Sequence, residues 1–241
     1  MLLTKAVLVL LSVFGCNCFN ISPNPNIVIR DSAEHVKKSS YFGFAINLRK
    51  SSVLIGAPKA TKNENIKETG EVIKCDITTL EDPNCYPYKF HANVNANFTN
   101  AYFESENNEY QMLGSTMDGF GSETDKFVVC APNLKNVRDT GKDRVKNYYL
   151  NGGCFMIQNS EKSETSNVTD IMLMKEENNQ IFSPGDRKAF HHHKFAQQGF
   201  SVHVTENSSE ILMGAPGVYL WSGKLISSNN LIFNDHVSIQ L

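Results

Sequence analysis

The chain reads Tyr41-Phe42-Gly43-Phe44-Ala45-Ile46 and, after a polar turn, Val53-Leu54-Ile55-Gly56-Ala57-Pro58. A unit of this shape occurs twice more, which indicates a repeat architecture. The proline follows the opening glycine by 15, 18 and 17 residues in the three units. The other two units read Met112-Leu113-Gly114-Ser115-Thr116 with Phe127-Val128-Val129-Cys130-Ala131-Pro132, and Gln198-Gly199-Phe200-Ser201-Val202 with Ile211-Leu212-Met213-Gly214-Ala215-Pro216.

Each unit predicts a series of β-strands. Phe42, Phe44 and Ile46 alternate with Gly43 and Ala45, the period of two that is typical of a strand. Proline cannot donate to a ladder, so each Ala-Pro marks the end of a second strand. A third strand is expected at 71–75, 153–158 and 218–224.

Repeated four-stranded sheets of this size predict an all-β fold, specifically a β-propeller. A solenoid of stacked β-units is the alternative. The prolines advance by 74 and 84 residues from unit to unit. That spacing is longer than the chain length of one blade without insertions. The additional residues are expected in two polar loops, 93–109 and 160–193.

The composition excludes several classes of protein. The 241 residues are 41% hydrophobic and 20% charged, a balance typical of a globular domain. A net charge of −2 and a pI near 6.4 lack the basic character of nucleic-acid binders, so no nucleic-acid partner is expected. After residue 20, no stretch approaches the roughly 18 apolar residues of a membrane span.

The first 18 residues predict a secretory signal peptide, cleaved before Phe19. Lys5 precedes the apolar run 6–14, and small residues follow it. A buried N-terminal helix is the alternative. Residues 19–241 then form the mature chain, in which Asn20, Asn97, Asn167 and Asn207 begin Asn-x-Ser/Thr sequons that are candidate glycosylation sites.

Cleavage would leave an even number of cysteines in an oxidising compartment, which predicts two disulfides. Zinc ligation is the alternative, but no C-x2-C pair occurs and the spacings suit no common zinc module. The cysteines concerned are Cys75, Cys85, Cys130 and Cys154.

No catalytic signature is found, and the chain is not expected to be an enzyme. The run His191-His192-His193 is the one cluster of metal-ligand type. Adjacent residues of an extended segment point to opposite sides, and no Asp, Glu or Cys follows at ligand spacing. A solvated loop is therefore expected there, with no metal and no cofactor.

The Phe-Gly and Gly-Ala-Pro pairs resemble the FG-GAP repeats of integrin α chains. The resemblance covers essentially the whole mature chain, and its motifs occur in the family's order. Phe19-Asn20-Ile21 is similar to the family's opening segment, which joins the last blade and closes the ring. The resemblance implies a seven-bladed propeller, of which residues 19–241 supply the closing strand and about three blades.

The same resemblance implies what lies elsewhere in a longer protein. No D-x-D-x-D-G calcium loop occurs here, so calcium is expected in other blades. A full-length relative would be a single-pass receptor at the cell surface, attached to the membrane only through a C-terminal span. It would pair with an integrin β chain and bind an extracellular-matrix protein.

Specific residues are assigned by the resemblance alone. The family pairs its cysteines within a repeat, which implies the disulfides Cys75–Cys85 and Cys130–Cys154. A basic residue of the β chain enters the axial channel, where rings of aromatics surround it. The positions that match those rings are Tyr41, Phe44, Met112 and Phe200.

The ligand-binding positions are assigned in the same way. His191 stands where Arg-Gly-Asp-binding α chains carry an aspartate, with Asp186 as the alternative counterpart. In those α chains an aromatic wall lies beside the aspartate, and the positions here that resemble it are Tyr219, Leu220 and Trp221. An imidazole cannot replace a carboxylate toward arginine, so adhesion that does not depend chiefly on Arg-Gly-Asp is expected.

Two other functions are compatible with FG-GAP repeats. One is a secreted propeller module that binds carbohydrate or protein. The other is the propeller of a secreted phospholipase, although no room for a catalytic domain exists between residue 18 and the first repeat.

Overall fold

The computed structural model describes residues 27–31, 39–61, 67–79, 83–88, 109–139, 146–158, 167–172, 181–182, 190–206, 210–229 and 232–234. The chain divides into two units, Met1–Arg30 and Asp31–Leu241. The proposed signal peptide and the segment at Phe19 lie outside the described residues. The account below concerns the second unit.

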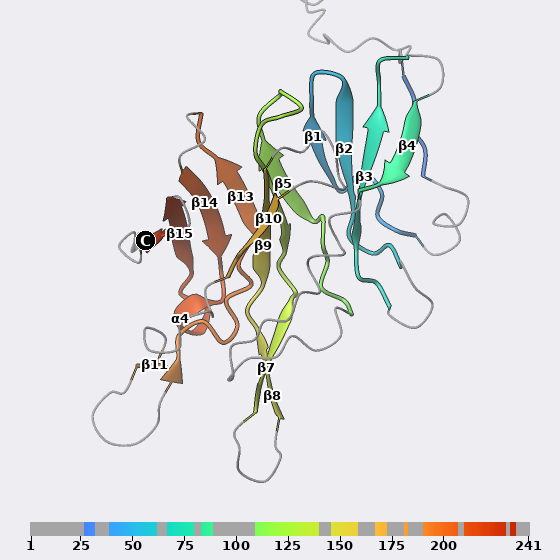
Figure 1. The fold of residues 1–241 in the computed structure, drawn as a ribbon. Helices are drawn as coiled ribbons and strands as arrows, with labels where there is room; N and C mark the ends of the chain where they lie inside the picture. Colours follow the sequence, from blue (N-terminus) through green and yellow to red (C-terminus); the bar gives the residue numbers. More distant parts are fainter. Residues whose placement is uncertain are drawn as a thin grey trace, which may run out of the picture. The chain divides into compact units, whose positions relative to one another are not determined.

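Three four-stranded antiparallel sheets make up this unit, and each is a simple up-and-down meander (Figure 1). The first runs β1 (Ala45–Leu48), β2 (Ser52–Ala57), β3 (Glu71–Asp76) and β4 (Asn84–Pro87). The second runs β5 (Thr116–Gly119), β6 (Phe127–Ala131), β9 (Gly153–Gln158) and β10 (Asn167–Ile171). The third runs β13 (Ser201–Val204), β14 (Glu210–Ala215), β15 (Lys224–Asn229) and β16 (Ile232–Asn234).

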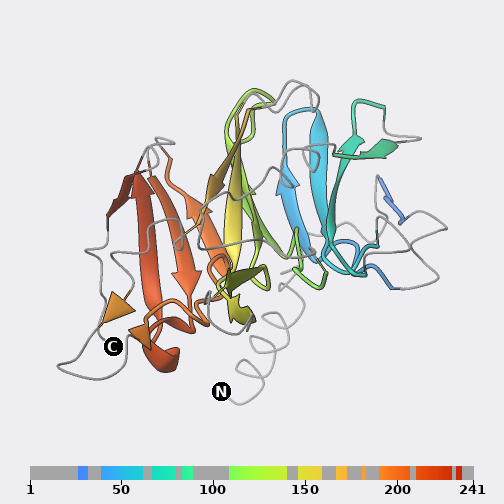
Figure 2. The same ribbon diagram turned by 60° about the horizontal axis from the view of Figure 1, so that its bottom comes forward.

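Two small hairpins interrupt this pattern. β7 (Lys135–Asp139) pairs with β8 (Lys146–Leu150) between β6 and β9, and β11 (Ile181–Phe182) pairs with β12 (Phe190–His191). The three large sheets lie side by side in both views (Figures 1 and 2). Their first strands, β1, β5 and β13, are neighbours. The second unit is therefore an all-β partial propeller, as predicted, with three blades.

The repeated motif has one backbone geometry in all three blades. The amide of the motif glycine donates to the carbonyl two residues before the Ala-Pro proline: Gly43 to Gly56 (3.0 Å), Gly114 to Cys130 (3.1 Å), and Gly199 to Gly214 (3.0 Å). The three motif glycines have φ of 86°, 85° and 86°, a left-handed conformation that glycine adopts without a Cβ clash. This bond explains why the two halves of the motif occur together.

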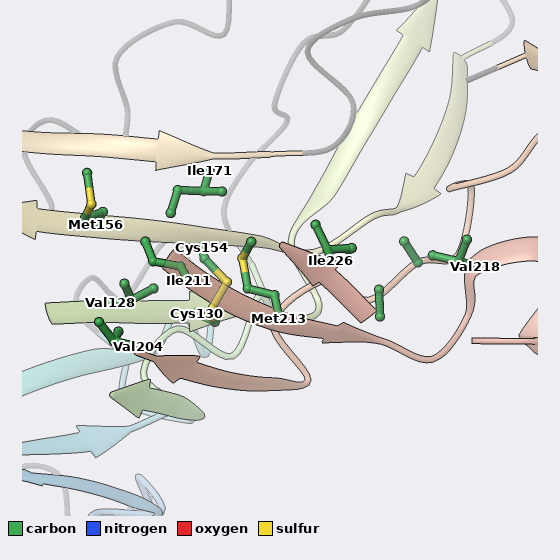
Figure 3. Close-up of a cluster of buried hydrophobic side chains, with 12 residues drawn as sticks. Val128, Cys130, Cys154, Met156, Ile171, Val204, Ile211, Met213, Val218 and Ile226 are labelled. Atoms are coloured by element: carbon green, nitrogen blue, oxygen red, sulfur yellow. A yellow bond between two sulfur atoms is a disulfide. The ribbon is translucent and has the colours of Figure 1, made fainter. Parts of the chain in front are cut away.

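The inner strands of the second sheet, β6 and β9, are buried on both faces, so they read as nearly continuous apolar runs. In β6, Phe127 and Val129 pack into a core shared with the first sheet. Val128 and Cys130 point the other way, into a core shared with the third sheet (Figure 3). Burying one such side chain stabilises the fold by about 1.5–3 kcal/mol, and the alternation divides this gain between two interfaces.

Burial along the strands of the first and third sheets differs from burial in the second sheet. In β14, Ile211, Met213 and Ala215 are buried, while the residues between them are half-exposed. In β1, Ile46 and Leu48 are 61% and 67% exposed. The period of two predicted from the sequence is therefore correct. In β1, however, the apolar members face solvent, because the polar members face the second sheet.

The third strand of the third repeat was predicted wrongly. β15 begins at Lys224, not at 218. Ala215 pairs with Lys224, so the residues between them form the connection from β14 to β15. In each repeat the third strand starts directly after a glycine with positive φ, namely Gly70, Gly152 and Gly223.

Two further expectations need correction. Stretch 160–193 is not only a loop, because β10 lies in it and completes the second blade. The sequence also leads one to expect Cys85 just before the fourth strand of its repeat, whereas Cys85 lies within β4. Stretch 93–108 lies outside the described residues.

Both predicted disulfides are confirmed. Cys75 pairs with Cys85 across β3 and β4, and Cys130 pairs with Cys154 across β6 and β9. The β7–β8 hairpin lies between Cys130 and Cys154 in the sequence. The second disulfide lies at the centre of the core in Figure 3.

Polar contacts join the first blade to the second. Asn47 Nδ2 donates to the carbonyl of Gly119 (3.0 Å). Arg49 Nη1 donates to the carbonyl of Ser122 (2.6 Å), and its guanidinium carbon lies 5.1 Å from the Phe127 ring centroid. Arg49 is only 3% exposed. Burial lowers the pKa of Arg49 despite the opposing charges of Glu123 and Asp125, but the group stays protonated.

Glu123 is the centre of the same interface. Its carboxylate accepts a 3.0 Å bond from Lys74 Nζ, with bonds from the hydroxyls of Ser51 and Ser52 (both 2.9 Å). Burial raises the pKa of Glu123, but these hydrogen bonds outweigh it and lower the pKa to about 2, against an ordinary value of 4.5. The carboxylate therefore stabilises the folded state fully above pH 4.5, and this contribution is lost as the pH falls toward 2.

Replacing Glu123→Gln is expected to lower the free energy of unfolding at pH 7 by about 1–2 kcal/mol, since the site is partly open to solvent. The variant should also lose less further stability between pH 5 and pH 3 than the wild type. Urea unfolding at these pH values measures both effects. The exposed Glu206 provides the control: if Glu206→Gln changes stability as much as Glu123→Gln, the assigned role of Glu123 is wrong.

Candidate partner-binding and ligand-binding surfaces

The four predicted partner-binding residues occupy two recurring positions of the repeat. Tyr41 and Met112 each lie two residues before the motif glycine, and Phe44 and Phe200 each follow it directly. Both positions come just before the first strand of a blade. Because β1, β5 and β13 are neighbours, these positions lie around the line where the blades meet.

Three of the four side chains present aromatic surface to solvent. Tyr41, Phe44 and Phe200 are 44%, 56% and 61% exposed. The rings of Tyr41 and Phe44 stack, with centroids 6.2 Å apart and planes 12° from parallel. Lys59 Nζ lies 4.4 Å from the Tyr41 ring centroid, so this ring already holds a cation of its own chain. The arrangement can hold a further cation by its ring faces.

The set of aromatics is interrupted at the second blade. Met112 accepts a 3.0 Å contact at its sulfur from Asn133 Nδ2. The residue that matches Phe44 and Phe200 there is Ser115, which is 5% exposed. Gln197 matches Tyr41 in the third blade. The left-handed backbone of Tyr41, Met112 and Gln197 (φ 58°, 60° and 49°) marks these positions as equivalent, a signal that the sequence alone did not give.

The histidine segment is not a solvated loop, contrary to the prediction. His193 is 4% exposed and His192 is half-buried. Asn151 Nδ2 donates to the carbonyl of His193 (2.6 Å), and the amide of Tyr219 donates to the carbonyl of His192 (3.0 Å). These bonds hold the segment against both neighbouring connections. The backbone of His191 lies in β12; Asp186 lies outside the described residues.

The structure brings the histidine segment together with the predicted aromatic wall. The rings of His192 and Tyr219 are 4.5 Å apart. Tyr219, Leu220 and Trp221 are 42%, 65% and 62% exposed and form the tip of the β14–β15 connection, next to the label α4 (Val218–Trp221) in Figure 1. Burial, and then the charge of Lys224, lower the pKa of His192, which favours the neutral form of this ring.

The backbone of this tip is strained. Tyr219, Leu220 and Trp221 have φ of 51°, 57° and 71°. A left-handed conformation costs a non-glycine residue about 1–2 kcal/mol. Bonds from the amide of Gly223 to Val218 (3.1 Å) and from Ser222 Oγ to Tyr219 (2.9 Å) hold the tip in place. Strain of this kind concentrates at functional sites.

The described residues offer no site for metal chemistry. Within them, no group of three or more His, Cys, Asp or Glu side chains could hold a metal ion. No helix in the same part of the chain has the length and apolarity to cross a bilayer. Of the sequons, Asn167 begins β10, and the other three lie outside the described residues.

Comparison with known proteins identifies several relatives, although no family model matches the chain. Integrin alpha-PS3 of Drosophila melanogaster is 33% identical over 221 residues, which cover 86% of this chain and 19% of that protein. Integrin alpha-PS5 of the same organism is 31% identical, with the same coverage. Integrin alpha-V of Gallus gallus is 28% identical over 79% of this chain and 16% of its own length. This chain spans less than a fifth of the length of these relatives.

Proposed function

This chain is related to the integrin alpha chains over most of its length, and from that relationship we propose that it is part of the alpha subunit of a cell-adhesion receptor. The observation that carries the proposal is the 33% identity to Integrin alpha-PS3 over 86% of this chain. The backbone bond from the motif glycine to the strand that ends in Ala-Pro recurs in all three blades and agrees with it. The proposed role is binding and signalling, without catalysis.

The proposed receptor is a heterodimer with an integrin β chain. Its contact on this chain is the set of exposed aromatics where the blades meet, Tyr41, Phe44 and Phe200, with Met112 completing the set. A basic side chain of the β chain would gain about 0.5–2 kcal/mol from each ring face. The same proposal includes entry into the secretory pathway through residues 1–18 and attachment to the cell surface by a span elsewhere in the protein.

The proposed ligand is a protein of the extracellular matrix, bound through His191, Tyr219, Leu220 and Trp221. The contact between His192 and Tyr219 supports a joint surface, because it fixes the two segments to each other. A histidine at position 191 in place of a carboxylate supports binding that does not depend chiefly on Arg-Gly-Asp, because an imidazole lacks the two oxygens that pair with a guanidinium. A secreted carbohydrate-binding propeller is the other candidate, but no observation favours it.

Phe200→Ala in the full-length alpha chain is expected to lower the yield of heterodimer, because one ring of the proposed contact is lost. A loss of about 0.5–2 kcal/mol weakens association by about 2- to 30-fold. Co-immunoprecipitation with a co-expressed β chain, normalised to total alpha chain, measures it. Phe195→Ala is the control, since Phe195 is also exposed (38%) but is not at an axial position. Equal yields from the two variants would argue against the proposed contact.

A further inference from the structure

The β6–β9 connection is strongly basic and lies at the same end of the blades as the aromatic tip. The described strands of this connection, β7 and β8, carry Lys135, Arg138 and Lys146 against Asp139. Figure 1 shows the β7–β8 hairpin and α4 at the lower end of the sheets. At the opposite end of the second and third blades, the charge of the connections is mainly negative. Their described residues include Glu123, Asp125 and Glu206 against Lys126. In the described parts of these connections, positive charge therefore predominates at one end and negative charge at the other.

Aromatic rings hold two lysines at the basic end. Lys194 Nζ lies 5.4 Å from the ring centroids of both Tyr149 and Phe195. Lys135 Nζ lies 5.7 Å from the ring centroid of Tyr110. Within the described residues, neither lysine has a carboxylate as ion-pair partner. A ring face restrains an ammonium group and leaves its N–H donors able to bind an anion.

The segments that carry the two lysines and the aromatic tip are linked to one another by backbone hydrogen bonds. Lys135 pairs with Leu150 in the hairpin, and the carbonyl of Leu150 accepts a bond from the amide of Gln197 (3.2 Å). Lys194 is in the same segment as Gln197, two residues after His192, whose carbonyl binds the amide of Tyr219 (3.0 Å). Backbone bonds thus fix the hairpin, the histidine segment and the tip to one another.

We propose that this basic-aromatic surface, made of Lys135, Lys194, Phe195, Tyr219, Leu220 and Trp221, binds an acidic peptide segment that also carries an apolar side chain. The lysines bind the carboxylates of the segment, and Leu220 and Trp221 bury its apolar side chain. The inference rests on the proposed function. It specifies the chemistry of the part of the ligand that this chain binds.

A peptide fits this surface better than a sulfated polysaccharide. A polysaccharide would use the positive charge, but it would leave unused the apolar area of Leu220 and Trp221, which are 65% and 62% exposed. Burying apolar area contributes about 25 cal/mol per Å². An arginine-bearing ligand is disfavoured because Lys135, Lys194 and Lys224 would repel it.

The test is selection from a random displayed peptide library on the full-length heterodimer. The library is first depleted on the Lys135→Glu/Lys194→Glu heterodimer, which removes peptides whose carboxylates bind elsewhere. We expect the selected peptides to be rich in Asp and Glu next to an aromatic or aliphatic residue. Their affinity should fall at least about tenfold in the depleting variant and in Trp221→Ala, since charge-assisted bonds and buried aromatics are strong contacts.

Two matched variants serve as controls. Lys135→Arg/Lys194→Arg keeps both charges and should retain affinity within about twofold, while Lys126→Glu changes a cation at the opposite end and should have no effect. Selected peptides rich in Arg or Lys, or no enrichment after depletion, would overturn the inference. So would heparin binding that depends on Lys135 and Lys194 when no peptide is enriched.

Assembly of the heterodimer, measured on the same cells, separates this inference from the proposed function. If the alpha chain does not pair with any β chain, the proposed function is wrong and the inference with it. If the heterodimer forms but the selected peptides are not acidic, only the inference is wrong.

Discussion

Replacing Gly199→Ala is expected to lower the free energy of unfolding by about 3–4 kcal/mol. A Cβ at this position would lie 2.5 Å from Cys130 Cβ and 2.6 Å from Cys154 Sγ, closer than such atoms approach in proteins. The disulfide cannot move aside, because both cysteines are buried in the core of Figure 3. Overpacking costs about 1–3 kcal/mol, and the left-handed backbone adds about 1–2 kcal/mol.

Gly43→Ala is the matched control. Gly43 has the same φ of 86°, but an added Cβ would meet nothing within 4 Å. Its cost should be the backbone strain alone, about 1–2 kcal/mol. Thermal and urea unfolding of the two purified variants, together with their secreted yields, measure the difference. Equal destabilisation would show that the contact of Gly199 with the disulfide is unimportant.

The second large effect is expected from removal of the Cys130–Cys154 disulfide. Replacing both residues with alanine should lower stability by about 3 kcal/mol, because a loop of 24 residues is no longer closed in the unfolded chain. The loss of two buried side chains from the core adds to this cost. Cys75→Ala/Cys85→Ala opens a loop of 10 residues and should cost about 2–3 kcal/mol.

Urea unfolding of the two double variants measures these costs, and the order of the two is the result that matters. A larger loss from the Cys75–Cys85 pair would contradict the assigned place of Cys130–Cys154 in the core. Peptide mapping under non-reducing conditions checks the pairing itself. A peptide that joins Cys75 to Cys130 or Cys154 would contradict it.

The local elements of the fold could be predicted from the sequence because their signals are local. Glycine with positive φ, the alternation of apolar residues, and proline after a strand each act over a few residues. The second and third strands of the first two repeats follow from them. The third repeat failed because Val218 to Trp221 is as apolar as a strand, and only Gly223 marks where the strand begins.

The candidate surfaces could be predicted only in part. The sequence indicated the aromatic tip and the histidine segment, but it placed His193 in solvent, whereas Asn151 and Tyr219 hold the segment in place. It also missed Lys135 and Lys194, because a lysine near a ring in space has no pattern along the chain. Of their three rings, Tyr110 and Tyr149 come from segments 25 and 45 residues away, and Phe195 is adjacent to Lys194.

The sequence by itself determined the three-fold repeat, with a glycine turn and an Ala-Pro strand in each unit, and the position of each cysteine pair within a single repeat. Tertiary structure decided which face of each strand is buried. Phe127 and Val128 are equally apolar neighbours in β6, and they enter different cores only because a sheet lies on each side. Asn47 is buried while Ile46 is exposed, because the second blade lies on the side of Asn47. Burial depends on the neighbouring sheet, whose residues are far away along the chain, and so no local pattern contains it.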